Sequence, residues 1–153
     1  NYDVSNHRFE SRGLLHCALQ IPGWERVLHC ICAHLSLHER GRQRQLEAIK
    51  GVVESYVPSA APVIIAGDFN DWGLRSTHTL AGMGLHSLQA GQHPTFPARL
   101  PLVQLDHVYA RGLLAAFREG EARGVGAVKY EGMMVDYANV RLAERTLSLA
   151  GAL

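Results

Sequence analysis

The sequence predicts a single domain of the α+β class, and three features of the chain carry this prediction. Two strand-like runs, 13–21 and 26–35, are joined by a short Pro-Gly connection, which is typical of an antiparallel hairpin. An amphipathic helical pattern follows over 39–57. The short run 63–66 is apolar and β-branched and lies between a proline and a glycine, so it predicts a strand that is buried on both faces.

Length and composition fit one ordinary globular domain that covers 1–153. The chain has 153 residues, enough to bury a core, and its 47% hydrophobic and 19% charged residues do not indicate disorder. The formal net charge is +1, so no strong field attracts nucleic acid or a membrane surface. No apolar run approaches the ~20 residues that a membrane-spanning helix needs.

The first predicted helix has one apolar stripe. Leu46, Ile49, Val53 and Tyr56 recur at steps of three and four residues, which places them on one face. The arginines near the start of this helix are most simply a solvated face. Prolines after the last apolar position end the helix before the buried strand begins.

The second half of the chain alternates loops with short elements. We expect a short helix over 75–81, a surface loop rich in Gly and Pro over 90–101, and a strand over 104–111. Alternation within that strand places its side chains on two faces, with Leu105, His107 and Tyr109 on one and Asp106, Val108 and Ala110 on the other. Continuation of the strand through 113–117, turns and loops over 119–131, and a final strand over 136–147 complete the prediction.

The cysteines do not indicate a disulfide framework, because Cys17, Cys30 and Cys32 are an odd number. The stretch 29–34, His-Cys-Ile-Cys-Ala-His, has the composition of a zinc site. However, one residue separates its cysteines where structural zinc sites have two to four, and no second pair follows. Core cysteines on one face of a strand are the favoured interpretation, and a reducing compartment, the cytoplasm, fits them best.

The chemistry-bearing block is Gly-Asp-Phe-Asn-Asp at the end of the buried strand. Asp68, Asn70 and Asp71 place three oxygen-bearing side chains at its carboxyl end. Asp68 and Asn70 are two residues apart and point the same way if the chain is extended. Carboxylate and amide oxygens without a soft ligand suit a hard ion such as Mg²⁺. Taken alone, the same residues are equally typical of a turn.

Four blocks in order resemble a known family. They are AHLSLHERGRQRQL, VIIAGDFNDW, PTFP and LDHVYARG. This order is similar to the endonuclease/exonuclease/phosphatase family, whose members hydrolyse phosphodiesters or phosphomonoesters with Mg²⁺ or Mn²⁺. The resemblance implies a DNase I-like sandwich of two packed, mostly antiparallel β-sheets flanked by helices. It covers only the later part of a family domain, since the early Asn and metal-binding Glu have no counterpart. We therefore expect a domain that lacks its N-terminal part.

The resemblance also implies roles for individual residues. Asp68 would hold the metal or align the attacking water, and Asn70 would bind the scissile phosphate beside the metal. His34 would donate to the phosphate or the leaving group, and Asp106 would orient the general base. Asp136 would be a further metal ligand. The implied metal set is thus Asp68, Asn70 and Asp136.

One position departs from the family's pattern. The family closes with a Ser-Asp-His block whose His is the general base, whereas this chain has Val135-Asp136-Tyr137. An imidazole of pKa about 6.5 accepts a proton at neutral pH, but a phenol of pKa about 10 is already protonated. The resemblance therefore implies a catalytic position for Tyr137, with a side chain that predicts impaired hydrolysis.

Two functions follow from these features. The first is a metal-dependent phosphoesterase, acting as nuclease or phosphatase through Mg²⁺-activated water. The alternative is a catalytically degenerate relative that recognises phosphate or binds a partner, and both Tyr137 and the missing early Glu favour it. DNA, RNA, phosphoinositides and small phosphoesters are all acted on by this family, and a fold does not choose among them. The near-zero net charge argues mildly against tight nonspecific DNA binding.

Overall fold

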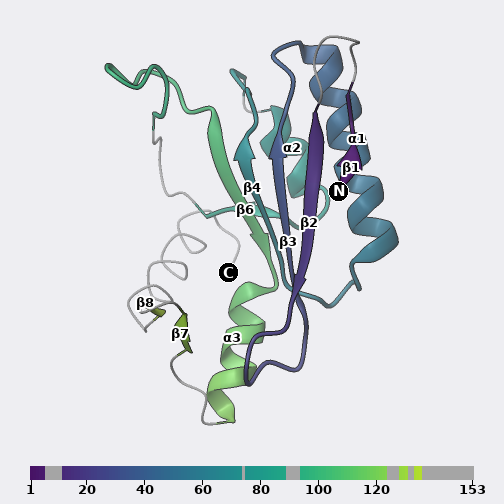
Figure 1. Ribbon diagram of the computed structural model, residues 1–153, viewed down its shortest axis with the longest axis vertical. Coiled ribbons are helices and arrows are strands. Elements are labelled where there is room, and N and C mark those ends of the chain that lie inside the picture. The colour runs from purple at the N-terminus through teal and green to yellow at the C-terminus, as the bar shows by residue number, and fades with distance from the viewer. Residues whose placement is uncertain (6–11, 74, 89–93, 124–127, 131–132, 136–153) are drawn as a thin grey trace.

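A six-stranded mixed β-sheet forms the centre of the computed structural model, which describes residues 1–5, 12–73, 75–88, 94–123, 128–130 and 133–135 (Figure 1). Its strands are β1 (Tyr2–Asp3), β2 (Gly13–Leu19), β3 (Leu28–His34), β4 (Val63–Asp68), β5 (His86–Ser87) and β6 (Asp106–Arg111). They lie in the order β1-β2-β3-β4-β6-β5, in which only β3 and β4 are parallel. The predicted hairpin is the β2–β3 pair. The predicted apolar strand is the interior strand β4, but it is buried on one face only, because Val63 and Ile65 are buried while Ile64 and Ala66 on the other face are partly exposed.

Helix α1 (Glu39–Tyr56) connects the parallel strands β3 and β4 and covers one face of the sheet. Its buried side chains include Leu46, Ile49 and Val53, as the spacing predicts, and they pack with the inward residues of the strands. Tyr56 is an exception, because 58% of it is exposed at the end of the helix. Arg42 is also buried, whereas the pattern predicts a solvated arginine face. The predicted short helix over 75–81 is α2 (Arg75–Ala81).

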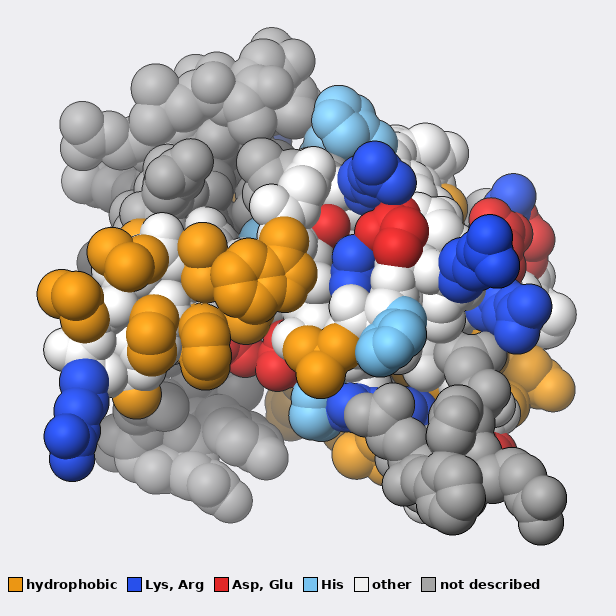
Figure 2. Space-filling view, turned by 90° about the horizontal axis from the view of Figure 1, so that it is seen from above, with side chains coloured by type: hydrophobic (Ala, Val, Ile, Leu, Met, Phe, Trp, Pro, Cys, Tyr) orange, Lys and Arg blue, Asp and Glu red, His pale blue; other side chains and the backbone are white. Residues whose placement is uncertain are grey.

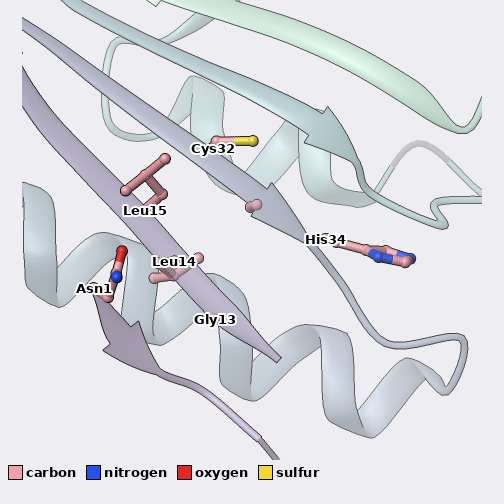
Figure 3. A pocket seen from close by; sticks show the side chains of 7 residues that line it. Asn1, Gly13, Leu14, Leu15, Cys32 and His34 are labelled. Atoms are coloured by element: carbon pink, nitrogen blue, oxygen red, sulfur yellow. The ribbon is translucent and has the colours of Figure 1, made fainter. Parts of the chain in front are cut away.

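The two faces of the sheet differ in how they are covered. The core face carries Leu14, Ile31 and Ile65, each almost fully buried beneath the helices. On the opposite face, Leu15 and Leu19 remain 49% and 43% exposed. A mainly apolar pocket of about 280 Å³ lies on β2 and β3 near the N-terminus (Figure 3). Among the described residues, this second face, called the open face below, has no sheet packed against it.

The cysteines belong to the open face and not to the helix-covered core. Cys17 lies directly opposite Cys30 in the β2–β3 pair, and Cys32 follows two positions later on the same side. All three are free thiols, and none is fully buried. The prediction of core cysteines is therefore wrong for the described structure. Burial of the Cys30 thiol, strengthened by its neighbour Cys17, raises its pKa above the usual value.

The segment after β6 forms a helix, not the predicted continuation of the strand. Gly112 has φ 68°, a left-handed conformation that ends the extended chain, and α3 (Leu113–Ala122) begins at the next residue. Gly120 of this helix lies against Trp24, because an added Cβ would be 3.0 Å from the indole Cδ1. A salt bridge of 2.7 Å joins Glu119 to Arg26. The helix thus packs on the β2–β3 connection, at the end of the sheet away from the tops of β3 and β4 (Figure 1).

The two packed sheets of the predicted sandwich are not both present among the described residues. Apart from the main sheet, the structure has a two-stranded antiparallel sheet of β7 (Val128–Tyr130) and β8 (Met133–Val135). The predicted loop over 119–131 therefore contains the end of α3 and a short strand. The final strand predicted over 136–147 lies outside the described residues. No helix in the described part of the chain is long and apolar enough to cross a membrane.

Candidate functional site

Three predicted site residues form one row across the sheet. His34 is paired with Asp68 in the β3–β4 register, and Asp68 is paired with Asp106 in the β4–β6 register. Partners in a sheet direct their side chains to the same face, so all three side chains lie on the open face. The row lies where β3 and β4 end and β6 begins, at the upper edge of the sheet in Figure 1. Three of the predicted site residues thus lie side by side on neighbouring strands, and their roles stay predictions.

The imidazole of His34 is the exposed member of the row. Its Nε2 lies 3.5 Å from Asp68 Oδ2, and 58% of the His34 side chain is accessible to solvent, against 35% for Asp68. Figure 3 shows His34 extending beyond the end of β3, away from Leu15 and Cys32. The imidazole can therefore reach a ligand from outside while staying beside a carboxylate.

Asn70 is held in one orientation behind this row. It has φ 46°, a left-handed conformation that Asn adopts more readily than most residues. Its backbone N–H donates to Asp68 Oδ1 at 2.9 Å, and its side-chain Nδ2 donates to the Leu35 carbonyl at 2.9 Å. The block is thus a turn and a cluster of oxygen ligands at once, so the two sequence interpretations do not exclude each other.

Gly67 allows β3 and β4 to approach closely beside the row. It has φ +145°, and an added Cβ would overlap the carbonyl oxygen of Ala33 and lie 2.9 Å from its carbonyl carbon. Any side chain here would separate the two strands. The spacing of His34 and Asp68 therefore depends on a glycine between the apolar run and the first carboxylate.

Three charged side chains help to position the site, although the sequence analysis assigns none of them a catalytic or metal-binding role. Asp71 is buried and accepts from the backbone N–H groups of Arg75 at 3.1 Å and Ser76 at 2.7 Å, so it caps α2. Glu39 bonds to Arg75 at 2.9 Å, which ties α1 to α2. Arg42 donates to the Leu37 carbonyl at 2.6 Å and holds the turn after β3. Only Asp71, within the Gly-Asp-Phe-Asn-Asp block, had a signal in the sequence.

Thr95 fixes the start of β6. Its Oγ1 accepts from the backbone N–H groups of Leu105 at 3.1 Å and Asp106 at 3.3 Å. Its own N–H donates to the Val103 carbonyl at 2.8 Å. The Pro-Thr-Phe-Pro block therefore supports the backbone of Asp106 directly, which is a structural reason for a hydroxyl at this position.

Behind the row, His107 lies in the core with two aromatic neighbours. Its ring meets Phe69 edge to face, with centroids 5.8 Å apart, and stacks on Tyr109 at 5.7 Å. Burial lowers the pKa of His107 below its usual value, although the carboxylates of Asp71, Asp106 and Asp68 oppose this shift. Burial also raises the pKa of Tyr109 to about 12. Both groups are therefore neutral near pH 7.

The oxygen donors of the row fit a hard divalent cation in kind, because Asp68 and Asp106 are carboxylates on one face. Within the described ranges, however, no group of three or more His, Cys, Asp or Glu side chains is close enough to hold a metal ion. Asp136, a predicted ligand, lies outside the described residues, and so does Tyr137.

Comparisons with known proteins give the following relatives. The chain is 38% identical over 121 residues to the uncharacterized protein YbhP of Escherichia coli (strain K12). The aligned region covers 76% of this chain and 47% of YbhP. The chain thus spans about half the length of the curated relatives it matches. A functionally unknown conserved protein from Enterococcus faecalis V583 superposes with a TM-score of 0.58 at 18% identity, covering 72% of this chain and 52% of that one.

Another solved structure has a similar fold. The endonuclease/exonuclease/phosphatase from Beutenbergia cavernae DSM 12333 superposes with a TM-score of 0.52 at 20% identity, covering 72% of this chain and 36% of that one. The family model named Endonuclease/Exonuclease/phosphatase family matches residues 2–128, which include the whole row. Since this match extends over most of the sequence, the chain belongs to the endonuclease/exonuclease/phosphatase family.

Proposed function

We propose that the chain is the catalytic part of a metal-dependent phosphoesterase that hydrolyses a phosphodiester or phosphomonoester. The observation that carries this proposal is the row of His34, Asp68 and Asp106 on adjacent strands. In-line hydrolysis needs a group that binds the phosphate and carboxylates that bind a cation or a base, all within reach of one phosphorus atom. One side of the sheet supplies both kinds of group.

Each residue has a role that its surroundings allow. His34 is accessible and donates a proton or a hydrogen bond to the phosphate or the leaving oxygen. Asn70 uses one side-chain N–H for Leu35, so its second N–H can donate to a phosphate oxygen. Asp106, supported by Thr95, orients the group that accepts the proton of water.

The metal set that we propose is Asp68 and Asn70 together with Asp136. Mg²⁺ or Mn²⁺ bound there would lower the pKa of a coordinated water and offset charge on the phosphate. The backbone N–H of Asn70 already bonds to Asp68 Oδ1, which fixes that carboxylate in place. The second carboxylate oxygen, Oδ2, is the one that faces His34.

We further propose that the open face is covered by a second sheet in the complete domain, as in the sandwich that the resemblance implies. The exposed apolar side chains Leu15 and Leu19 support this proposal, because exposed apolar area of this kind favours a packed partner. The family's opening strands, which carry the early Glu and have no counterpart in these 153 residues, would supply that sheet. The cysteines of the open face would then be buried beneath that sheet, and a reducing compartment would keep them as free thiols.

The experiment measures release of p-nitrophenol from bis(p-nitrophenyl) phosphate and p-nitrophenyl phosphate, with Mg²⁺ and with a chelator. We expect Mg²⁺-dependent release that falls by at least ~10²-fold in Asp68→Asn and Asp106→Asn. Glu54→Gln is the matched control, since it also removes one carboxylate but lies on the exposed side of α1. Loss of activity in the control as well would show that charge alone, not this site, is responsible.

A binding module without catalysis is the second candidate, and Tyr137 in place of the expected base His favours it. This candidate predicts that phosphate ligands still bind at the row although neither ester is hydrolysed. The same assay, repeated with the upstream segment of the reading frame restored, separates the two. Failure of the restored protein to hydrolyse either ester would leave the binding module as the function.

A further inference from the structure

An exposed aromatic pair lies beside the row. Trp72 and Phe96 are 58% and 48% exposed, and their rings meet edge to face with centroids 6.3 Å apart. Large aromatic side chains are usually placed where they lose more contact with water than this. Figure 2 looks down on the upper end of the molecule in Figure 1. Hydrophobic side chains gather there on the left, the side to which the segment before β6 projects in Figure 1, and acidic and histidine side chains lie next to them.

Both aromatic residues are direct sequence neighbours of residues that position the candidate site. Trp72 follows Asp71 and is two positions after Asn70, in the turn that ends β4. Phe96 is fixed by two backbone hydrogen bonds with Val103, each 3.0 Å long. Its neighbour Thr95 accepts from the backbone N–H of Asp106. Phe96 thus lies next to the residue that supports Asp106, and Trp72 lies in the turn that follows Asn70.

We propose that Trp72 and Phe96 form a stacking wall for a planar ring carried by the substrate next to its phosphate, and that this ring is an unpaired nucleobase. The inference rests on the proposed function, because it assumes that the phosphate binds at the row. A flat indole that is more than half exposed suits a planar ring, whereas an acyl chain needs a groove to enclose it. The stacking wall thus indicates a substrate with a nucleobase, whereas the row alone indicates only a phosphoester.

Charge supports a single unpaired base over a long duplex. A protein that neutralises several phosphates needs an excess of Lys and Arg, but the formal net charge here is +1. Stacking on aromatic side chains gives affinity without charge and tolerates any base. The expected ligand is thus a mononucleotide or the end of a single strand.

The test compares two phosphates that differ only in the base. Affinities of the native chain for adenosine 5′-monophosphate and ribose 5-phosphate are measured by calorimetry with Mg²⁺ present. We expect the nucleotide to bind roughly 5- to 150-fold more tightly, the range that one stacked base gives. Trp72→Ala should reduce the nucleotide's affinity to that of ribose 5-phosphate and leave ribose 5-phosphate unchanged.

Leu102→Ala is the matched control, because Leu102 is 68% exposed in the same projecting segment and should not alter either affinity. A second readout uses Trp24→Phe, which leaves Trp72 as the sole tryptophan, and expects its fluorescence to be quenched by the nucleotide alone. Equal affinities in the native chain, no binding of either phosphate, an equal loss of both in Trp72→Ala, or quenching by phosphatidylcholine vesicles in place of the nucleotide would each overturn the wall.

Failure of this inference is distinguishable from failure of the proposed function. If the chain prefers the nucleotide but hydrolyses no phosphoester, the inference of a stacking wall stands and the proposed catalytic function fails. If the chain hydrolyses bis(p-nitrophenyl) phosphate but binds both sugar phosphates equally, the catalytic function stands and the inference of a stacking wall fails.

Discussion

Asp68 and Asp106 face each other directly across the antiparallel pair of β4 and β6. Like charges at opposed positions of a sheet destabilise the pair, so this placement opposes folding. His34, on the other neighbouring strand, reaches Asp68 at 3.5 Å and offsets part of the repulsion only when its ring is protonated. Two opposed carboxylates are therefore a local cost that a bound cation would relieve.

Asp106→Asn should make the protein more stable in the absence of divalent ions. Removing one of the two opposed charges gains about 0.2–1 kcal/mol in the free energy of unfolding. Addition of Mg²⁺ should reduce this difference, because the cation stabilises only the native pair. Urea denaturation with chelator and with Mg²⁺ measures both effects, with Glu54→Gln as the charge control. A less stable Asp106→Asn protein in chelator would show that the carboxylate has a structural partner.

Gly67→Ala should destabilise the protein strongly and disturb the row. The added methyl group would overlap the Ala33 carbonyl oxygen at a φ of +145°, so β3 and β4 must separate. Strain of this kind costs roughly 3 kcal/mol or more. Gly51→Ala is the control, since its added Cβ meets nothing within 4 Å in helix α1, and it should stabilise by about 0.5–1 kcal/mol. Equal effects in the two variants would contradict the close approach.

His107 should make the protein less stable in mild acid. Its pKa is lowered in the folded state, so between that value and about 6.5 the unfolded chain binds the additional proton. Stability is therefore complete above about pH 6.5 and is lost as pH falls towards the folded pKa, by up to about 1.4 kcal/mol per pH unit. Burial lowers the pKa of His29 as well, and this group adds to the same trend.

Denaturation midpoints of His107→Phe between pH 7 and pH 5 test this contribution. The slope of stability against pH should decrease in this variant, because the aromatic packing on Phe69 is kept while the titrating group is removed. His86→Gln is the control for the loss of an imidazole, since His86 is exposed on β5. An unaltered slope in His107→Phe would assign the acid sensitivity to other groups.

Local patterns predict the elements near the row, because each has a signal within a few residues. The β-branched run before Gly67 indicates β4, and alternation after Leu105 indicates β6. Leu113 shows where such signals end. The run 113–117 is apolar enough for a strand, but the left-handed Gly112 and the fit of Gly120 against Trp24 select a helix. That choice depends on a contact between segments distant in sequence, which no local window contains.

The candidate site is predictable to a similar extent. Motif order gives His34, Asp68, Asn70 and Asp106, and strand register brings three of them into one row. The exposure of the cysteines and the burial of Arg42 depend on which surfaces are covered by other elements. The positioning hydroxyl of Thr95 depends on a bond across ten residues. These exposures and contacts follow from tertiary packing, so they cannot be predicted from composition or local patterns.

Tyr137→His should convert a poor hydrolase into a better one. The expected base position holds a phenol, which is protonated near pH 7, whereas an imidazole accepts a proton there. In a chain that also carries the family's early metal-binding Glu, the Mg²⁺-dependent rate should rise by ~10²–10⁴-fold, the usual value of general-base assistance. In the 153-residue chain alone the increase should be small, because the family's early metal-binding Glu has no counterpart among these residues.

The pH profile distinguishes a new base from a change in folding. A histidine acting as base gives a rate that rises with pH through about 6.5, because only the neutral ring accepts the proton of water. Tyr137→Phe removes the hydroxyl without adding a base, so its rate and pH profile should match those of the native protein. If Tyr137→His gains neither rate nor this rise with pH, while Tyr137→Phe loses activity, the tyrosine hydroxyl is itself functional. The general base then lies elsewhere in the chain, and Asp136 and Tyr137 do not correspond to the Asp-His of the family's closing block.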